Sequence, residues 1–186
     1  MPIVTCVLVL ACLALFAGAD PALLEWNREA IQKGEIWRLW TGHFTHYSFR
    51  HVLLDGGFAL LAGALAEREL GARFLLVLLA LASTAIGVGL VLATSLDTYR
   101  GLSGLGMALA GAAAAAWWSR SPGSRRLILV LVAALAGKLA LEAGGWSPNQ
   151  AGLPPGVGIA WQAHLAGVAL GAIASLLAIR SRVRSS

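Results

Sequence analysis

The chain has 186 residues, of which 58% are hydrophobic and only 12% are charged, and its formal net charge is +5. A chain this apolar and this poor in charge is not an ordinary soluble domain. The basic residues mostly lie at the ends of apolar runs, so the positive charge indicates a membrane topology and not a nucleic-acid partner.

Six apolar runs of transmembrane length follow one another along the chain: 3–19, 50–67, 72–94, 102–118, 125–142 and 160–179. Runs of about 20 apolar residues are typical of transmembrane helices. They predict an all-α membrane protein with six transmembrane helices, forming a single domain over 1–186. We expect the first run to be a membrane helix and not a signal peptide, because no basic residues precede it.

The cations between these runs indicate an orientation. They are densest in the short connections after the second and fourth runs and beyond the last run, at Arg68, Arg73, Arg120, Arg125, Arg126, Arg180, Arg182 and Arg184. The positive-inside rule then predicts that both termini are cytoplasmic. The connections 20–49, 95–101 and 143–159 are expected on the outer side.

Two of the outer connections have a distinctive composition. Between residues 23 and 40, Trp and aliphatic residues alternate with charged ones, which predicts an amphipathic segment in the outer interface. Trp26, Trp37 and Trp40 would form its aromatic belt. The last outer connection, 144–158, is rich in Gly and Pro and predicts a mobile cover.

Ser103 lies in the sequence Gly101-Leu102-Ser103-Gly104, where the fourth apolar run begins. Small residues of this kind often serve only to let membrane helices pack closely. The glycines also leave room around the hydroxyl, and a helix that begins here directs free N–H groups and its positive dipole end toward Ser103. An oxyanion formed next to the serine would be stabilised there, so Ser103 is also a candidate nucleophile.

His164 lies in the sequence Ala163-His164-Leu165-Ala166-Gly167, where the sixth run begins. Gly167 and Gly171, four residues apart, let this helix pack with its backbone close to a partner helix. If the partner is the helix of the fourth run, His164 faces Ser103 at the same depth and can act as its general base. A dyad without a third carboxylate is chemically sufficient. The alternative is a histidine that only bonds a backbone carbonyl.

Three more histidines, His43, His46 and His51, cluster where the second run begins. His43 is expected to cap a helix at the interface. His51 and Asp55 are one turn apart and share a helix face, and Asp55 lies where a charge is costly. We expect both to point into a polar cavity with Ser103 and His164, where His51 could donate a hydrogen bond to an oxyanion.

In their order and spacing, these motifs resemble the rhomboid family of intramembrane serine proteases. The matching residues are Trp37-Arg38, His46, His51, Gly101-Leu102-Ser103-Gly104, Ala163-His164-Leu165-Ala166-Gly167 and Gly171. The resemblance implies a six-helix rhomboid-like bundle with Ser103 as nucleophile, His164 as base and His51 as oxyanion-hole donor. It implies no cofactor and no metal. It also implies a first loop lodged in the outer leaflet, and substrate entry gated by the fifth helix and the last outer loop.

Asp55 stands where most rhomboids have an asparagine that helps the oxyanion hole. A carboxylate there opposes an oxyanion unless it is protonated or turned toward His51. This variant and the compact form resemble the rhombosortase branch. That resemblance implies a bacterial inner membrane and transmembrane or tail-anchored protein substrates that carry a C-terminal Gly-Gly motif, one apolar helix and a basic tail.

Two other functions are compatible with the same residues. A metal-dependent membrane hydrolase would use the set His43, His46, His51, Asp55 and His164, although no His-Glu-X-X-His pair is present. A non-catalytic rhomboid-like protein would bind transmembrane clients without cleaving them.

Overall fold

The computed structural model describes residues 1–146, 153–154 and 157–185, with side chains to 181. Much of the predicted mobile cover at 144–158 lies outside the described residues. Within the described residues, six helices have 16 or more residues: α1 (Ile3–Gly18), α5 (Phe49–Leu70), α6 (Ala72–Ala93), α7 (Ser103–Arg120), α8 (Arg125–Ala143) and α9 (Trp161–Ser185). Their bounds lie within three residues of the six predicted runs, apart from the end of α9, which extends beyond the predicted end at 179.

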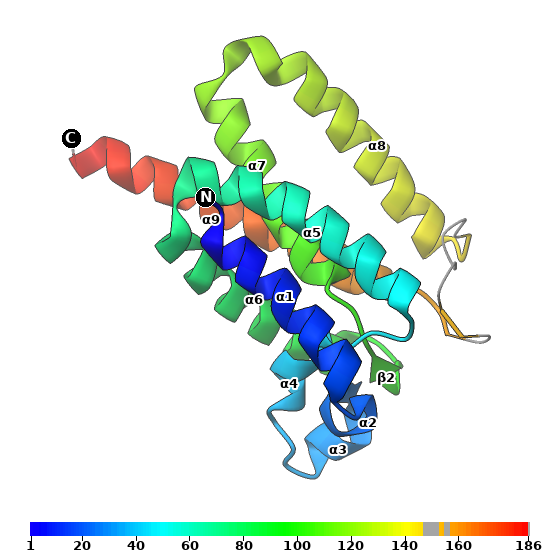
Figure 1. Cartoon of the computed structure of the whole chain (residues 1–186). Helices are drawn as coiled ribbons and strands as arrows, with labels where there is room; N and C mark the ends of the chain where they lie inside the picture. Colours follow the sequence, from blue (N-terminus) through cyan, green and yellow to red (C-terminus); the bar gives the residue numbers. More distant parts are fainter. Residues whose placement is uncertain (147–152, 155–156, 186) are drawn as a thin grey trace.

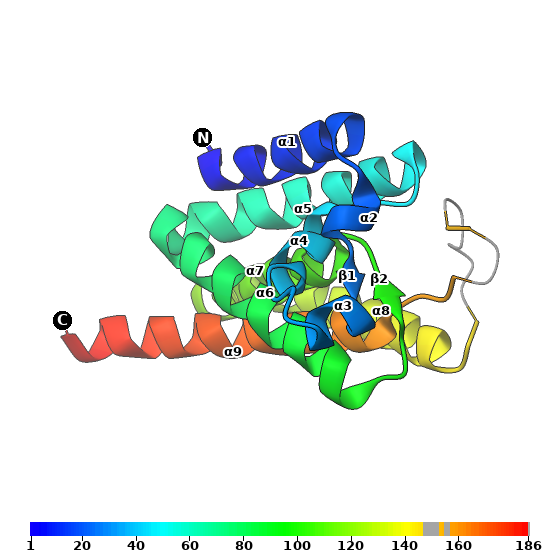
Figure 2. The ribbon, with the colours of Figure 1, turned by 90° about the horizontal axis from the view of Figure 1, so that it is seen from below.

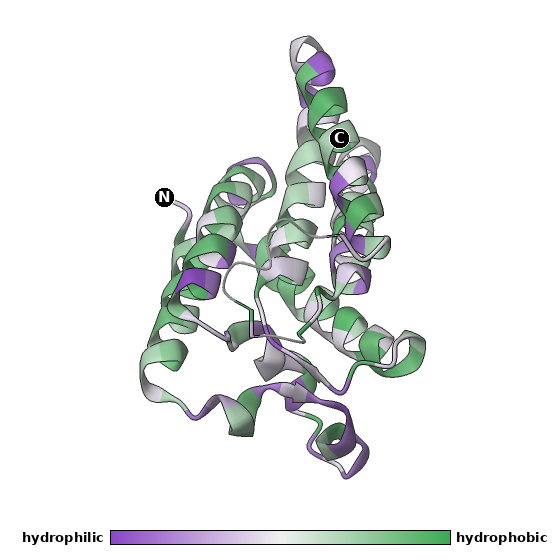
Figure 3. Cartoon of the chain, turned by 90° about the vertical axis from the view of Figure 1, so that its right-hand side faces the viewer, coloured by the Kyte–Doolittle hydropathy of each residue, from purple (hydrophilic) through white to green (hydrophobic). Residues whose placement is uncertain are grey.

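Three helices in the described part of the chain are long and apolar enough to cross a membrane: Phe49–Leu70, Ala72–Ala93 and Trp161–Ser181. α1 is apolar but shorter. Large apolar side chains cover the outer faces, such as Leu61 at 72% and Leu92 at 79% exposure, and the middles of the helices are largely green in Figure 3. This is the surface of an integral membrane protein. Six crossings remain a prediction.

The helices form a bundle with α7 at its centre (Figure 1). Ten of the 18 residues of α7 are buried, because alanines and glycines let α5 and α9 approach it closely. Both termini lie at one end of the bundle, and the short elements of the first loop lie toward the other end (Figure 2).

α7 and α9 touch through their backbones. A Cβ at Gly167 would overlap the carbonyl oxygen of Gly104, and a Cβ at Gly171 would overlap that of Ala108. Gly111 of α7 meets the Val168 carbonyl of α9 in the same way. Glycines on both helices therefore set the spacing of the two helices that carry Ser103 and His164.

The sequence predicted one amphipathic segment in the first loop, but the loop forms several short elements instead. The elements of this loop are α2 (Pro21–Leu24), β1 (Trp26–Asn27), α3 (Arg28–Gln32), α4 (Arg38–Thr41) and the 3-10 turn η1 (Gly42–Phe44). Elsewhere in the chain, a second 3-10 turn, η2 (Pro122–Ser124), precedes α8. β1 pairs antiparallel with β2 (Thr98–Tyr99), a short ladder that was not predicted in an otherwise helical fold. A two-residue ladder is too short to leave an alternating pattern in the sequence.

The predicted aromatic belt is wrong for Trp26. This side chain is 1% exposed, and its indole N–H donates to the carbonyl of Gly87 in α6 at 3.0 Å. Trp37 and Trp40 are 47% and 38% exposed, as residues of an interface would be. The loop is thus anchored in the bundle by one tryptophan and exposes two others.

Arg28 fixes the first loop to the end of α6. Its guanidinium donates to the carbonyls of Leu90, Val91, Thr94 and Leu96 at 2.7 to 2.9 Å. The last carbonyls of a helix have no partner within the helix, so a planar five-donor group is well suited to cap them. The same contacts fix the start of the segment that leads through β2 into α7.

The α7–α9 contact gives a stability prediction. Gly171→Ala should lower the free energy of unfolding by about 1–3 kcal/mol, because the new methyl group forces the two backbones apart. Gly89→Ala, on α6 with open space around it, is the matched control and should be neutral or slightly stabilising. Thermal unfolding in detergent micelles measures both, and equal midpoints would contradict the close contact.

Candidate functional site

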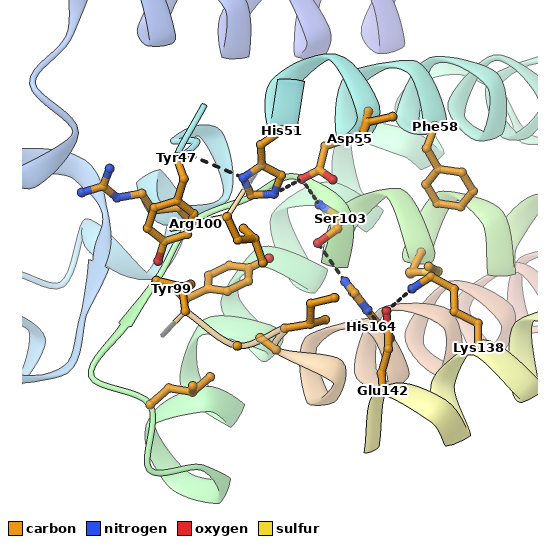
Figure 4. Close-up of a pocket in the computed structure, with 18 of the residues that line it drawn as sticks. Tyr47, His51, Asp55, Phe58, Tyr99, Arg100, Ser103, Lys138, Glu142 and His164 are labelled. Atoms are coloured by element: carbon orange, nitrogen blue, oxygen red, sulfur yellow. Dashed lines mark hydrogen bonds and ion pairs between the residues drawn. The ribbon is translucent and has the colours of Figure 1, made fainter. Parts of the chain in front are cut away.

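Ser103 and His164 meet at the start of α7 (Figure 4). Ser103 is the first residue of α7, and its Oγ lies 2.9 Å from Nε2 of His164 in α9. His164 is 5% exposed, while Ser103 is half-buried and faces a cavity. The backbone contact at Gly167, one turn beyond His164, brings the two helix ends to this distance.

Asp55 accepts hydrogen bonds from two groups beside Ser103. Its Oδ2 lies 3.1 Å from the backbone nitrogen of Ser103 and 3.2 Å from Nε2 of His51. Nδ1 of His51 accepts the backbone N–H of Tyr47 at 3.4 Å, so the proton of the neutral ring is on Nε2 and points at Asp55. The two donors that could bind an oxyanion next to Ser103 thus converge on one carboxylate oxygen.

Gly101 makes room for this arrangement. Its φ of +139° lies in the region that favours glycine. A Cβ there would be 3.0 Å from Oδ2 of Asp55 and 3.2 Å from the His51 ring. The Tyr99 hydroxyl holds the turn in place by donating to the Gly101 carbonyl at 2.7 Å. Gly104 lies on the other side, against the Tyr99 hydroxyl and Ala163.

A cavity of about 360 Å³ lies over Ser103. α5 contributes His51, Leu54, Asp55 and Phe58 to its wall, and α8 contributes Leu135, Lys138 and Glu142. Leu153 and residues 157–160, between α8 and α9, close another side. The cavity combines an apolar wall with the polar groups beside Ser103, so it can take a peptide segment and present one carbonyl to the serine.

The three histidines that cluster near the start of α5 do not all join the site. His46 lies under it: its Nε2 accepts the N–H of Leu102 at 3.3 Å and is 3.5 Å from Oδ2 of Asp55. His43 is 1% exposed, and its Nε2 lies 3.2 Å from the Ser83 carbonyl, so the predicted interfacial cap is wrong. Among the described residues, no group of three or more His, Cys, Asp or Glu is arranged to hold a metal ion.

Glu142 belongs to the site but was not predicted from the sequence. This residue of α8 has a side chain only 4% exposed, and its Oε2 lies 2.9 Å from Nδ1 of His164. Its Oε1 contacts Nζ of Lys138, one turn earlier. A signal was present in the sequence, since an acid and a lysine four residues apart interrupt an apolar run.

Buried His43 gives a pH prediction. Burial lowers its pKa to about 4, against the opposing effect of the Ser83 carbonyl. In the unfolded chain a histidine binds a proton near pH 6.5, so its contribution to stability is complete above that pH and is lost as the pH falls toward 4. The unfolding midpoint should therefore drop more between pH 7.5 and 5 in the wild type than in His43→Gln. Parallel drops would contradict this.

A search of curated proteins found no match to this chain. The family model described as Rhomboid domain matches residues 33–181, which is most of the chain and includes every residue of the site. The chain therefore belongs to the rhomboid family, whose members are generally serine-type intramembrane proteases.

Proposed function

We propose that this protein is an intramembrane serine protease in which Ser103 is the nucleophile and His164 the general base. The observation that carries the proposal is the 2.9 Å contact between Ser103 Oγ and His164 Nε2 at the wall of a cavity. A hydroxyl is a weak nucleophile until a base can take its proton, and this distance is within the reach that such a transfer needs.

The reaction would proceed through an acyl-enzyme. Ser103 Oγ attacks the scissile carbonyl while its proton passes to Nε2 of His164. The tetrahedral intermediate collapses, His164 returns the proton to the leaving amine, and the acyl group remains on Ser103. A water molecule, deprotonated by His164, then attacks the ester and releases the second product.

The oxyanion of the intermediate would bind at the donors that Asp55 now occupies. The N–H of Ser103 is at the N-terminus of α7, where the helix dipole favours negative charge. His51 supplies the second donor through Nε2. In this proposal, Asp55 is ionised and holds both donors in place until a substrate carbonyl oxygen takes its position.

The proposed substrates are transmembrane or tail-anchored proteins, as in the rhombosortase branch, with Gly-Gly near the cut. α5 and α8 both line the cavity, and this supports a substrate that enters from the lipid side, between these two helices. A glycine pair has no side chains to fit beside Asp55 and Ser103. The proposed setting is a bacterial inner membrane, with six crossings and both termini in the cytoplasm; the two termini do lie at one end of the bundle (Figure 2).

The catalytic prediction uses purified protein with a tail-anchored substrate bearing Gly-Gly and with a fluorophosphonate probe. Ser103→Ala and His164→Ala should each abolish cleavage and labelling, and the double variant should be no worse than either, because the pair acts as a unit. Product masses report the cut site, and EDTA should leave the rate unchanged.

The outcomes separate the alternatives. Cleavage that EDTA stops would indicate a metal hydrolase. Binding of the substrate without cleavage or probe labelling would indicate a non-catalytic client-binding protein. Clear residual turnover in Ser103→Ala would assign the nucleophile to another residue.

Asp55→Asn tests the role of the carboxylate. If Asp55 works ionised, the variant should lose turnover on the order of a hundredfold, the cost of one oxyanion donor, at every pH, because His51 is no longer held by an anion. A pH–rate profile measures this. Activity at or above wild type that extends to higher pH would instead mean that Asp55 acts as a neutral hydrogen-bond donor.

A further inference from the structure

α8 is the least packed long helix of the bundle and stands apart from the others in Figure 1. Of its 19 residues, all of them described, two are buried: Ile128 in the first turn and Glu142 in the last. The rest of the helix is mostly exposed apolar surface. An acidic side chain is therefore one of the two points at which this helix is buried in the protein.

The Glu142 carboxylate is divided between two partners. Oε2 lies 2.9 Å from Nδ1 of His164, and Oε1 contacts the ammonium group of Lys138. The Glu142 side chain is 4% exposed, whereas that of Lys138 is 40% exposed. Burying a carboxylate in an apolar helix is costly, and this one is placed against the imidazole that contacts Ser103.

The geometry fixes the state of the imidazole. For His164 to take a proton from Ser103, Nε2 must be unprotonated and the ring proton must be on Nδ1. A carboxylate oxygen at Nδ1 can only accept, so it selects this tautomer and aims Nε2 at Ser103. It also places a negative charge beside the ring when the ring becomes positive.

We propose that Glu142 is a positioning residue of the Ser103–His164 pair: it holds His164 through Nδ1 and stabilises the protonated ring formed during acyl transfer. The inference rests on the proposed function and replaces the dyad of the sequence analysis with a chain of three groups. Because Glu142 is carried by α8, the orientation of the base depends on the position of a helix that is otherwise loosely attached.

The test follows the rate of Ser103 labelling by a fluorophosphonate between pH 5 and 9, since this probe needs no transmembrane substrate. Serine attack on phosphorus expels fluoride, and the hydroxyl proton passes to His164. Glu142→Gln keeps an acceptor but removes the charge. We expect labelling to slow by on the order of tenfold or more. The acidic limb of the profile, where the labelling rate falls as the pH is lowered, should move to lower pH, because the protonated ring of His164 loses its counter-charge.

Lys138→Met is the opposing variant. It removes the cation that shares the carboxylate, so Glu142 acts on His164 with its full charge and the acidic limb should move to higher pH. Glu69→Gln is the matched control, because Glu69 pairs with Arg120 away from the cavity and should leave the profile unchanged. All three variants keep the other charged or titratable groups of the cavity, which are Tyr47, His51, Asp55, Tyr99 and Arg100.

Opposite shifts in Glu142→Gln and Lys138→Met support the inference. If Glu142→Gln slows labelling but leaves the acidic limb at the wild-type pH, Glu142 only holds α8 in place and the inference is overturned. A wild-type labelling rate and acidic limb in Glu142→Gln would also overturn it. If Glu142→Gln does not fold, Lys138→Met decides alone. If the folded wild type is labelled no faster than Ser103→Ala, the proposed function itself fails. If Ser103 is labelled in the wild type but the acidic limb does not move in Glu142→Gln or Lys138→Met, only this inference fails.

Discussion

The site depends on the backbone contact between α7 and α9. Ser103 and His164 are 61 positions apart in the chain. They meet because Gly167 and Gly171 let α9 lie against the carbonyls of Gly104 and Ala108. In a lipid environment helices gain little from hiding apolar side chains from each other, so close van der Waals packing of small residues is a main source of helix association.

Two acids of α5, Glu67 and Asp55, accept N–H groups from the starts of other helices. Glu67 accepts from the backbone N–H groups of Val4 and Thr5 and from the Thr5 hydroxyl, at 2.8 to 3.0 Å, and so caps the start of α1. Asp55 accepts the first N–H of α7. The same physical rule, that free N–H groups at helix starts attract anions, therefore holds the start of α1 at the C-terminal end of α5 and the start of α7 near its N-terminal end.

The sequence was sufficient to predict the long helices and the pairing of Ser103 with His164. Apolar runs of membrane length are a strong signal, and the glycines of α9 indicated where a partner helix would come close. The shared face of His51 and Asp55 followed from helical periodicity. These features are local in the chain, or depend on a single helix–helix contact.

The parts that could not be predicted depend on contacts between distant segments. β1 and β2 pair over two residues, and Trp26 is buried because Gly87 of α6 accepts its N–H. Interfacial and buried tryptophans have the same local sequence signature, so only the tertiary contact distinguishes them. The sequence does show an acid at Glu142 within an apolar run, but its contact with His164 could not be predicted, because the two residues are on different helices and a serine–histidine pair alone satisfied the chemistry.

The backbone contact between α7 and α9 has a consequence for how the bilayer acts on the protein. When lipid thickness changes, helices respond mainly by tilting. α7 and α9 are in backbone contact at Gly167, Gly171 and Gly111, so we expect them to tilt together and to keep the distance from serine to imidazole. α8 has no such joint. We therefore expect a thinner or thicker membrane to move the Glu142 carboxylate relative to Ser103 and His164, while the distance between those two side chains stays the same.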